Sequence, residues 1–167
     1  MVGSAATQIT RPVLLLSTMK YLVAVDGSEP SMNALRYAVE QAAATDATVV
    51  AISVVVPEQF FTGGDDPPMS YTEASDELVA EDVEDAETEA QEILDEAEEV
   101  GDETGVEVET GMLYGEPVEE LVEYADENDV NTIFVGHRGL SEEYEGLVGS
   151  TAKDVVGRAS APVTVVR

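Results

Sequence analysis

The stretch YLVAVDGSEP, residues 21–30, contains the turn that decides the fold. Its first five residues are apolar, which is typical of a short buried strand. The next three, Asp-Gly-Ser, favour a tight turn, and Pro30 suits the first turn of a helix that Ser28 or Glu29 would cap. A strand that runs through a turn directly into a helix is the repeating unit of α/β proteins.

The rest of the chain continues this alternation. Apolar runs predict buried strands over 49–56 and 132–135, and residues 163–166 predict an edge strand of alternating character. Residues 106–110 alternate between glutamates and less polar residues, which predicts a strand at the edge of the sheet. Further helices are predicted within 73–100, after Pro117, and from a Ser150 cap to about Ala159. Five strands and four helices in strict alternation indicate one α/β domain with three layers, a parallel sheet covered by helices on both faces.

The helix within 73–100 has an unusual composition. Between Glu73 and Glu99, 14 residues are Asp or Glu, and a narrow apolar stripe separates them. The members of this stripe are Val79, Val83, Ala86, Ala90, Ile93, Ala97 and Val100. Such a stripe could be the seam of a coiled coil, but its alanines favour close packing on a sheet. The carboxylates then form a solvated face rather than a metal store.

The overall charge is strongly negative. The chain of 167 residues has 36 Asp and Glu against 7 Lys and Arg, with a net charge of -29. DNA, RNA and anionic membranes are therefore excluded as partners, because they are bound by rows of Lys and Arg. Abundant acid with scarce lysine predicts a cytoplasm rich in salt, where charge repulsion is screened. An acidic protein from an ordinary cytoplasm is the alternative.

Several classes of site and location are excluded by what the sequence lacks. There is no cysteine, so disulfides and thiolate chemistry are absent. No apolar run approaches the ~20 residues of a transmembrane helix. Residues 1–18 do not resemble a secretory signal, and we expect them to be a disordered extension before a domain that spans 19–167.

Two turns suggest a ligand site. In an open parallel sheet, ligands bind beyond the carboxyl ends of the strands, where the strand order reverses. Asp26-Gly27-Ser28 ends the first strand, and a glycine-rich loop that begins at Gly136 ends the fourth. Main-chain N–H groups of such a loop, with those at the start of the helix near Ser150, can bind phosphate whatever the surface charge. A loop whose glycines serve only to turn the chain is the alternative.

The motifs of the chain together resemble the universal stress protein family, in its nucleotide-binding branch. Gly136 and Gly139, nine further residues, and then Gly149-Ser150 match the family signature G-x2-G-x9-G-[ST]. The segments AVDGS at 24–28 and APVTVVR at 161–167 also look like that family. The resemblance implies an adenine nucleotide alpha hydrolase-like fold with strand order 3-2-1-4-5.

The resemblance also implies an ATP site between the first and fourth strands, with Mg²⁺ (or Mn²⁺) on the phosphates. Asp26 matches the acid near the ribose and the metal, Ala24 lies beside it, and the backbone of Val54 faces adenine. Glycines of the two turns match the ribose and phosphate contacts. The full set of implied ligand residues is Ala24, Asp26, Val54, Val135, Gly136, His137, Arg138, Gly139, Gly149, Ser150 and Thr151.

Two features depart from the family pattern. His137 stands where a small hydroxyl residue is common, and it lacks an identifiable partner for general-base catalysis. Glu142, Glu143 and Glu145 lie in the nine-residue bridge, where carboxylates would oppose a triphosphate.

The predicted function is that of a cytoplasmic stress-response protein, which binds ATP as a switch or protective module. Alternatives are a slow ATP-hydrolysing enzyme of the same fold, with Arg138 or Lys153 neutralising charge, and a nucleotide-free interaction module. The resemblance further implies a homodimer formed through the last strand, Val163, Thr164, Val165 and Val166.

Overall fold

The structure is a computed structural model that describes residues 18–57, 73–139 and 148–167. Two predictions lie outside these ranges: the disordered extension (apart from residue 18) and the glutamates at 142, 143 and 145. None of the described helices is both long and apolar enough to cross a membrane.

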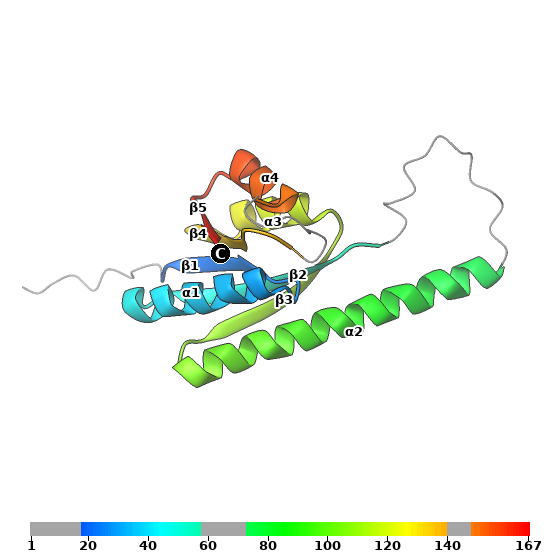
Figure 1. Ribbon diagram of the computed structural model, residues 1–167, viewed down its shortest axis with the longest axis horizontal. Helices are drawn as coiled ribbons and strands as arrows, with labels where there is room; N and C mark the ends of the chain where they lie inside the picture. The colour runs from blue at the N-terminus through cyan, green and yellow to red at the C-terminus, as the bar shows by residue number, and fades with distance from the viewer. Residues whose placement is uncertain (1–17, 58–72, 140–147) are drawn as a thin grey trace, which may run out of the picture.

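A single parallel sheet of five strands forms the centre of the molecule, as predicted (Figure 1). The strands lie in the order β3-β2-β1-β4-β5. Their bounds are β1 Lys20–Ala24, β2 Thr48–Val55, β3 Val108–Tyr114, β4 Thr132–Gly136 and β5 Val163–Val166. The order reverses between β1 and β4, because β1 pairs with β2 on one side and with β4 on the other.

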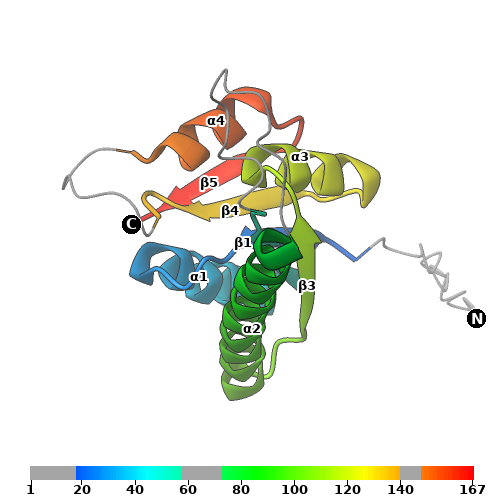
Figure 2. The ribbon, with the colours of Figure 1, turned by 90° about the vertical axis from the view of Figure 1, so that its right-hand side faces the viewer.

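Four helices cover the two faces of the sheet. They are α1 Glu29–Thr45, α2 Glu73–Thr104, α3 Pro117–Glu127 and α4 Ser150–Arg158. Figure 2 shows α1 and α2 on one face and α3 and α4 on the other. Each face has its own apolar core, one centred on Val23 and Leu35, the other on Leu22 and Leu121. Successive residues of β1 therefore supply opposite cores, as the alternation of side chains along a strand requires.

The turn after β1 leads into α1 as the sequence predicts. Ser28 is the N-cap, and its side chain accepts a hydrogen bond from the Ser31 N–H at 3.3 Å. Pro30 lies in the first turn, where its missing N–H leaves no unpaired helix donor. The turn therefore ends β1 and begins α1 within four residues.

The edge position predicted for β3 is confirmed, but its extent differs from the prediction. The strand begins at Val108 and continues to Tyr114, beyond the alternating residues 106–110. Gly111 interrupts the apolar pattern and hides this extension in the sequence. A Cβ at Gly111 would lie 2.7 Å from Cδ1 of Ile52, its partner in β2, so a close strand contact explains the glycine.

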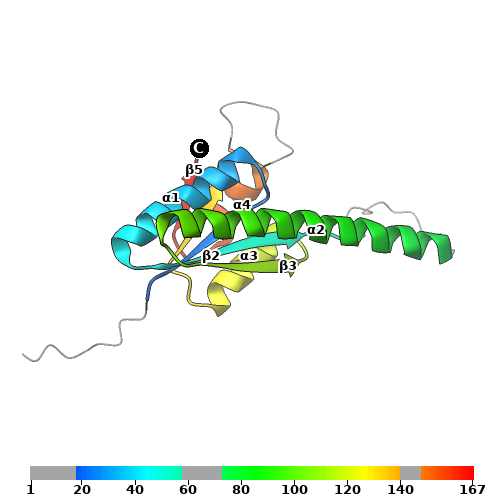
Figure 3. The ribbon, with the colours of Figure 1, turned by 90° about the horizontal axis from the view of Figure 1, so that it is seen from below.

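The C-terminal half of α2 packs on the sheet rather than forming a coiled-coil seam. Ala90, Leu94 and Ala97 are buried, and the last of these is fully enclosed. Ile93, placed in the predicted stripe, is only partly buried, and Leu94 takes the inward position beside it. Figure 3 shows the N-terminal part of the helix projecting past the end of the sheet.

Candidate functional site

A cavity of about 240 Å³ lies at the carboxyl ends of β1 and β4, where the strand order reverses. This is the position at which open parallel sheets bind ligands. The residues that line it are Ala24, Val25, Asp26, Ser31, Ile52, Val54, Pro117, Leu121, Val135, Gly136, Arg138, Gly139, Gly149, Ser150, Thr151 and Ala152. Ten of the eleven predicted ligand residues are among them, and His137 is not.

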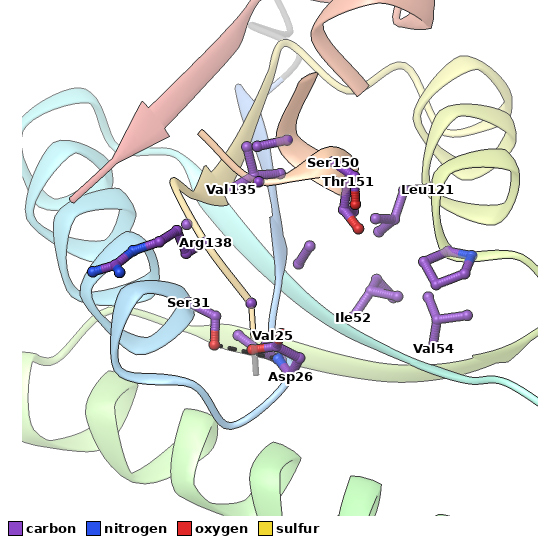
Figure 4. A pocket seen from close by; sticks show the side chains of 16 residues that line it. Val25, Asp26, Ser31, Ile52, Val54, Leu121, Val135, Arg138, Ser150 and Thr151 are labelled. Carbon is purple, nitrogen blue, oxygen red and sulfur yellow. Dashed lines mark hydrogen bonds between the residues drawn. The ribbon is translucent and has the colours of Figure 1, made fainter. Parts of the chain in front are cut away.

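One end of the cavity is apolar. Ile52 and Val54 come from β2, and Leu121 comes from α3, and the three side chains lie together in Figure 4. Pro117, at the start of α3, extends this wall. Binding sites of this kind take a flat apolar group against aliphatic side chains, while a few polar groups fix its orientation. The sequence prediction missed the α3 residues, although the turn Gly115-Glu116-Pro117 placed the start of that helix beside the carboxyl end of a strand.

Asp26 supplies the carboxylate of the polar end. One of its oxygens, Oδ1, accepts a hydrogen bond from the Ser28 N–H at 2.9 Å. The Asp26 N–H is 3.3 Å from the Ser31 hydroxyl oxygen, which in turn donates to the Ser28 carbonyl at 2.9 Å. These bonds hold the carboxylate in the turn after β1, with its second oxygen, Oδ2, directed toward Gly139.

The glycines of the turn after β4 are required by two close contacts. A Cβ at Gly136 would lie 2.7 Å from the Pro30 carbonyl carbon and from the Ser31 nitrogen. A Cβ at Gly139 would lie 2.9 Å from Oδ2 of Asp26. Gly136 thus lets the start of α1 approach β4, and Gly139 lets the turn approach the carboxylate. The signature glycines join the two halves of the site.

Two of the predicted phosphate donors are already committed within the protein. The Gly149 N–H donates to the His137 carbonyl at 2.6 Å, and the His137 N–H donates to the Val166 carbonyl at 2.7 Å. These amides are therefore unavailable to a ligand, and the prediction of a free Gly149 amide is wrong. Both amides are occupied by hydrogen bonds to other segments of the chain, and the local sequence does not reveal such bonds.

The start of α4 still offers main-chain donors. Gly149, not Ser150, is the N-cap, and it makes no side-chain capping bond. The first bond of the helix runs from the Lys153 N–H to the Gly149 carbonyl, so Thr151 and Ala152 precede the first helical donor. Both residues line the cavity, and their amides carry the partial positive charge of a helix N-terminus.

Of the basic residues near the glycine-rich loop, only one lines the cavity. Arg138 does so, but in Figure 4 its side chain extends away from the other lining side chains. Lys153 lies on an exposed part of α4 and is not among the lining residues.

The residues present fit a magnesium ion only in combination with a phosphate ligand. Mg²⁺ keeps several waters and takes one or two protein carboxylates together with substrate phosphates. Asp26 is the sole carboxylate among the described lining residues. Across the described parts of the chain, no group of three or more acidic or histidine side chains could hold a metal.

Comparisons with known proteins identify the family and agree with the fold. The family model described as the universal stress protein family matches residues 18–167. A universal stress protein of Bacillus subtilis is 36% identical over 152 residues, covering 89% of this chain and 98% of its own. The structure of a universal stress protein from Lactobacillus plantarum has a TM-score of 0.75 at 25% identity, covering 89% of this chain and 97% of that one.

A second solved structure is that of a nucleotide complex. The universal stress protein of Archaeoglobus fulgidus, in complex with dAMP, has a TM-score of 0.62 and 28% identity. The match covers 89% of this chain and 98% of that chain. With the fold, the strand order and the family model in agreement, the chain belongs to the universal stress protein family.

Proposed function

We propose that this protein binds ATP in the cavity between β1 and β4 and acts as a nucleotide-dependent switch or protective module in a cytoplasmic stress response. The observation that carries the proposal is the cavity itself, in which an apolar wall faces a turn built from Asp26 and Gly139. The A. fulgidus relative holds an adenine nucleotide, dAMP, which supports the same ligand class here.

The cavity has an apolar end and a polar end, and this division supports one orientation of the nucleotide. Adenine would lie against Ile52, Val54 and Leu121, because a flat apolar base suits aliphatic side chains. The phosphates would lie at Gly139 and at the start of α4, where amides and the helix dipole attract an anion. Mg²⁺ would then bind between the phosphates and Asp26, where it would neutralise the charge of the phosphates.

Nucleotide binding is tested by equilibrium dialysis with labelled ATP and Mg²⁺ in molar KCl. We expect wild type to bind and Gly139→Val to lose binding, because the added side chain would displace the Asp26 carboxylate. Gly157→Val is the matched control, since nothing lies within 4 Å of a Cβ at that position. Absence of binding by wild type would instead favour a nucleotide-free interaction module.

Hydrolysis is the second candidate function. Sustained release of phosphate from ATP by wild type would favour the slow enzyme over the switch. Asp26 is the only described lining residue that could act as a base, and a carboxylate that also holds the metal is poorly suited to that role. We therefore expect no turnover beyond a trace.

We further propose a homodimer through β5. The strand lies at the edge of the sheet, and Val165 is 36% exposed there. An open edge strand with an apolar side chain pairs readily with a copy of itself. Light scattering in molar KCl should give a dimer mass for wild type and a monomer mass for Val165→Asp. A monomeric wild type at micromolar concentration would overturn this part of the proposal.

A further inference from the structure

The turn after β4 contains an unusual pair of side chains. The Arg138 Nε–H donates a hydrogen bond to Nε2 of His137, with the two nitrogens 2.9 Å apart. Arg138 is the only Lys or Arg among the described residues that line the cavity, and His137 is the only histidine in the chain. The single cation at the rim is thus held by a neighbour that does not line the cavity.

The hydrogen bond requires a lone pair on Nε2 of the imidazole. A neutral imidazole that accepts a bond at Nε2 carries its proton on Nδ1. Nδ1 is buried, and within the described residues it has no hydrogen-bond partner. A buried donor without an acceptor destabilises the arrangement that contains it, by an amount comparable to a lost hydrogen bond. The bond between Nε2 and Arg138 therefore leaves the Nδ1 donor without an acceptor, which lowers the stability of this arrangement.

The backbone of His137 is fixed more firmly than its side chain. Its N–H bonds to the Val166 carbonyl at the end of β5, and its carbonyl accepts from the Gly149 N–H before α4. The imidazole is consequently attached to a rigid point between the last strand and the start of α4. Such a position can hold a neighbouring side chain in one place without moving itself.

The carboxylate of Asp26 lies against the residue that follows Arg138. Oδ2 of Asp26 comes within 2.9 Å of the place where a Cβ of Gly139 would be, and Gly139 follows Arg138 directly. A free guanidinium at this point would be drawn to that carboxylate, because arginine pairs strongly with carboxylates. Pairing would neutralise Asp26 and occupy the polar end of the cavity.

We propose that His137 is a positioning residue, which holds the Arg138 guanidinium away from Asp26 before a ligand binds and releases it to an incoming phosphate. This inference rests on the proposed nucleotide site and assigns a role to a residue that lies outside the cavity lining. A phosphate oxygen is a stronger acceptor for a guanidinium than a neutral imidazole, so the exchange is favourable when the ligand arrives. Until then Asp26 remains available to the metal.

The single histidine provides a direct measurement. Protein labelled with ¹⁵N-histidine shows the ring nitrogens of one residue only, so their protonation and bonding can be followed by NMR in molar KCl. In the nucleotide-free protein we expect Nδ1 to be protonated and Nε2 to be an unprotonated acceptor. As AMP is added, the chemical shift of Nε2 should change in proportion to the bound fraction measured by calorimetry. Saturation with adenosine, which lacks the phosphate, should leave it unchanged.

Affinity measurements on variants distinguish a positioning role of His137 from a purely structural role of its bond to Arg138. Arg138→Gln should weaken AMP binding by roughly tenfold, the effect of one charge-assisted hydrogen bond, and leave adenosine binding unchanged. His137→Leu should weaken AMP binding too, because Arg138 would then pair with Asp26. His137→Gln retains a hydrogen-bond acceptor, so its AMP affinity should be close to that of wild type. The double variant His137→Leu with Arg138→Gln should lose no more AMP affinity than Arg138→Gln alone.

The outcomes distinguish this inference from the proposed function. A protein that binds neither adenosine nor AMP would overturn both. AMP binding with an unchanged Nε2 signal, an equal shift with adenosine, or tighter AMP binding by His137→Leu would overturn only the positioning role. A nucleotide-free protein with the proton on Nε2 would also overturn it, whatever the variants do.

Discussion

At the scale of single residues, Gly136 and Gly139 differ from Gly157 in what surrounds them. Gly136 faces main-chain atoms of α1, and Gly139 faces a carboxylate, so a side chain at either would collide with a group that has little freedom to move. Gly157, in α4, faces open space. Gly136 and Gly139 are therefore needed where two segments meet, whereas Gly157 is replaceable.

Gly136→Ala should destabilise the protein. Its Cβ would lie 2.7 Å from the Pro30 carbonyl carbon, and relief of that contact requires α1 to move away from β4. We expect the free energy of unfolding to fall by about 1–3 kcal/mol, the usual cost of overpacking. Urea unfolding in molar KCl measures it.

Gly157→Ala is the control for that experiment. Alanine is favoured over glycine in a helix by up to about 1 kcal/mol, so stability should be unchanged or should rise. Equal losses in both variants would show that the contact between Gly136 and α1 is not the cause.

At the scale of elements, α2 has two parts with different environments. Its C-terminal half packs on β2 and β3 through Ala90, Leu94 and Ala97, which are all buried. Tyr114, at the end of β3, donates a hydrogen bond from its hydroxyl to Oε1 of Glu87 at 2.8 Å. Beyond this bond the helix projects past the sheet (Figure 1). The Tyr114–Glu87 bond therefore marks the region where α2 leaves the sheet.

Leu94→Ala should be costly, and Val83→Ala should not. Leu94 is 3% exposed in the core between α2 and the sheet, and truncation there leaves a cavity. A loss of about 2–5 kcal/mol in the free energy of unfolding is expected. Val83 lies N-terminal to Glu87 and is only partly buried, so its truncation should cost less than about 1 kcal/mol. Similar losses would mean that the whole length of α2 is packed in solution.

The hydroxyl bond of Tyr114 predicts a titration effect. The bond to Glu87 raises the pKa of Tyr114 above its usual value, with burial and the nearby negative charge as smaller causes. Because the bond needs the phenolic proton, it is present below this raised pKa and is lost as the pH rises through it. Glu87→Gln should lower the pKa of Tyr114 toward its usual value, as measured by phenolate absorbance. Tyr114→Phe identifies its signal among the six tyrosines.

At the scale of the whole molecule, charge is the dominant feature. A net charge of -29 on 167 residues repels itself and also repels an anionic ligand. The fold resists the first effect with two apolar cores, one on each face of the sheet. The candidate site resists the second through main-chain amides at the start of α4, which do not depend on the charge of the surface.

Stability should depend strongly on salt. Lowering KCl from about 1 M to about 0.1 M lengthens the Debye length from ~3 Å to ~10 Å, so that carboxylates on α2 repel one another across the helix surface. We expect the thermal midpoint, followed by circular dichroism, to fall steeply over this range. A neutral osmolyte in place of the salt should not restore it. A midpoint that is unchanged in low salt would reject a salt-rich cytoplasm as the origin of the composition.

The sequence by itself determined the order of strands and helices, a cap at Ser28 or Glu29, the edge character of β3 and the positions of the two turns. These follow from the periodicity of apolar residues and from the preferences of glycine, serine and proline, all of which act over a few neighbouring residues. The resemblance to a family added the strand order and most of the cavity lining.

Only the tertiary structure decided which groups of the site are available to a ligand. It committed the amides of His137 and Gly149 to bonds within the protein, bonded the Arg138 side chain to His137, and added α3 residues to the apolar wall. It also extended β3 past Gly111, because β3 pairs with β2 as far as Tyr114, and the close contact with Ile52 explains the glycine. Each of these features depends on contacts between segments that are distant in the chain, and local sequence preferences do not predict such contacts.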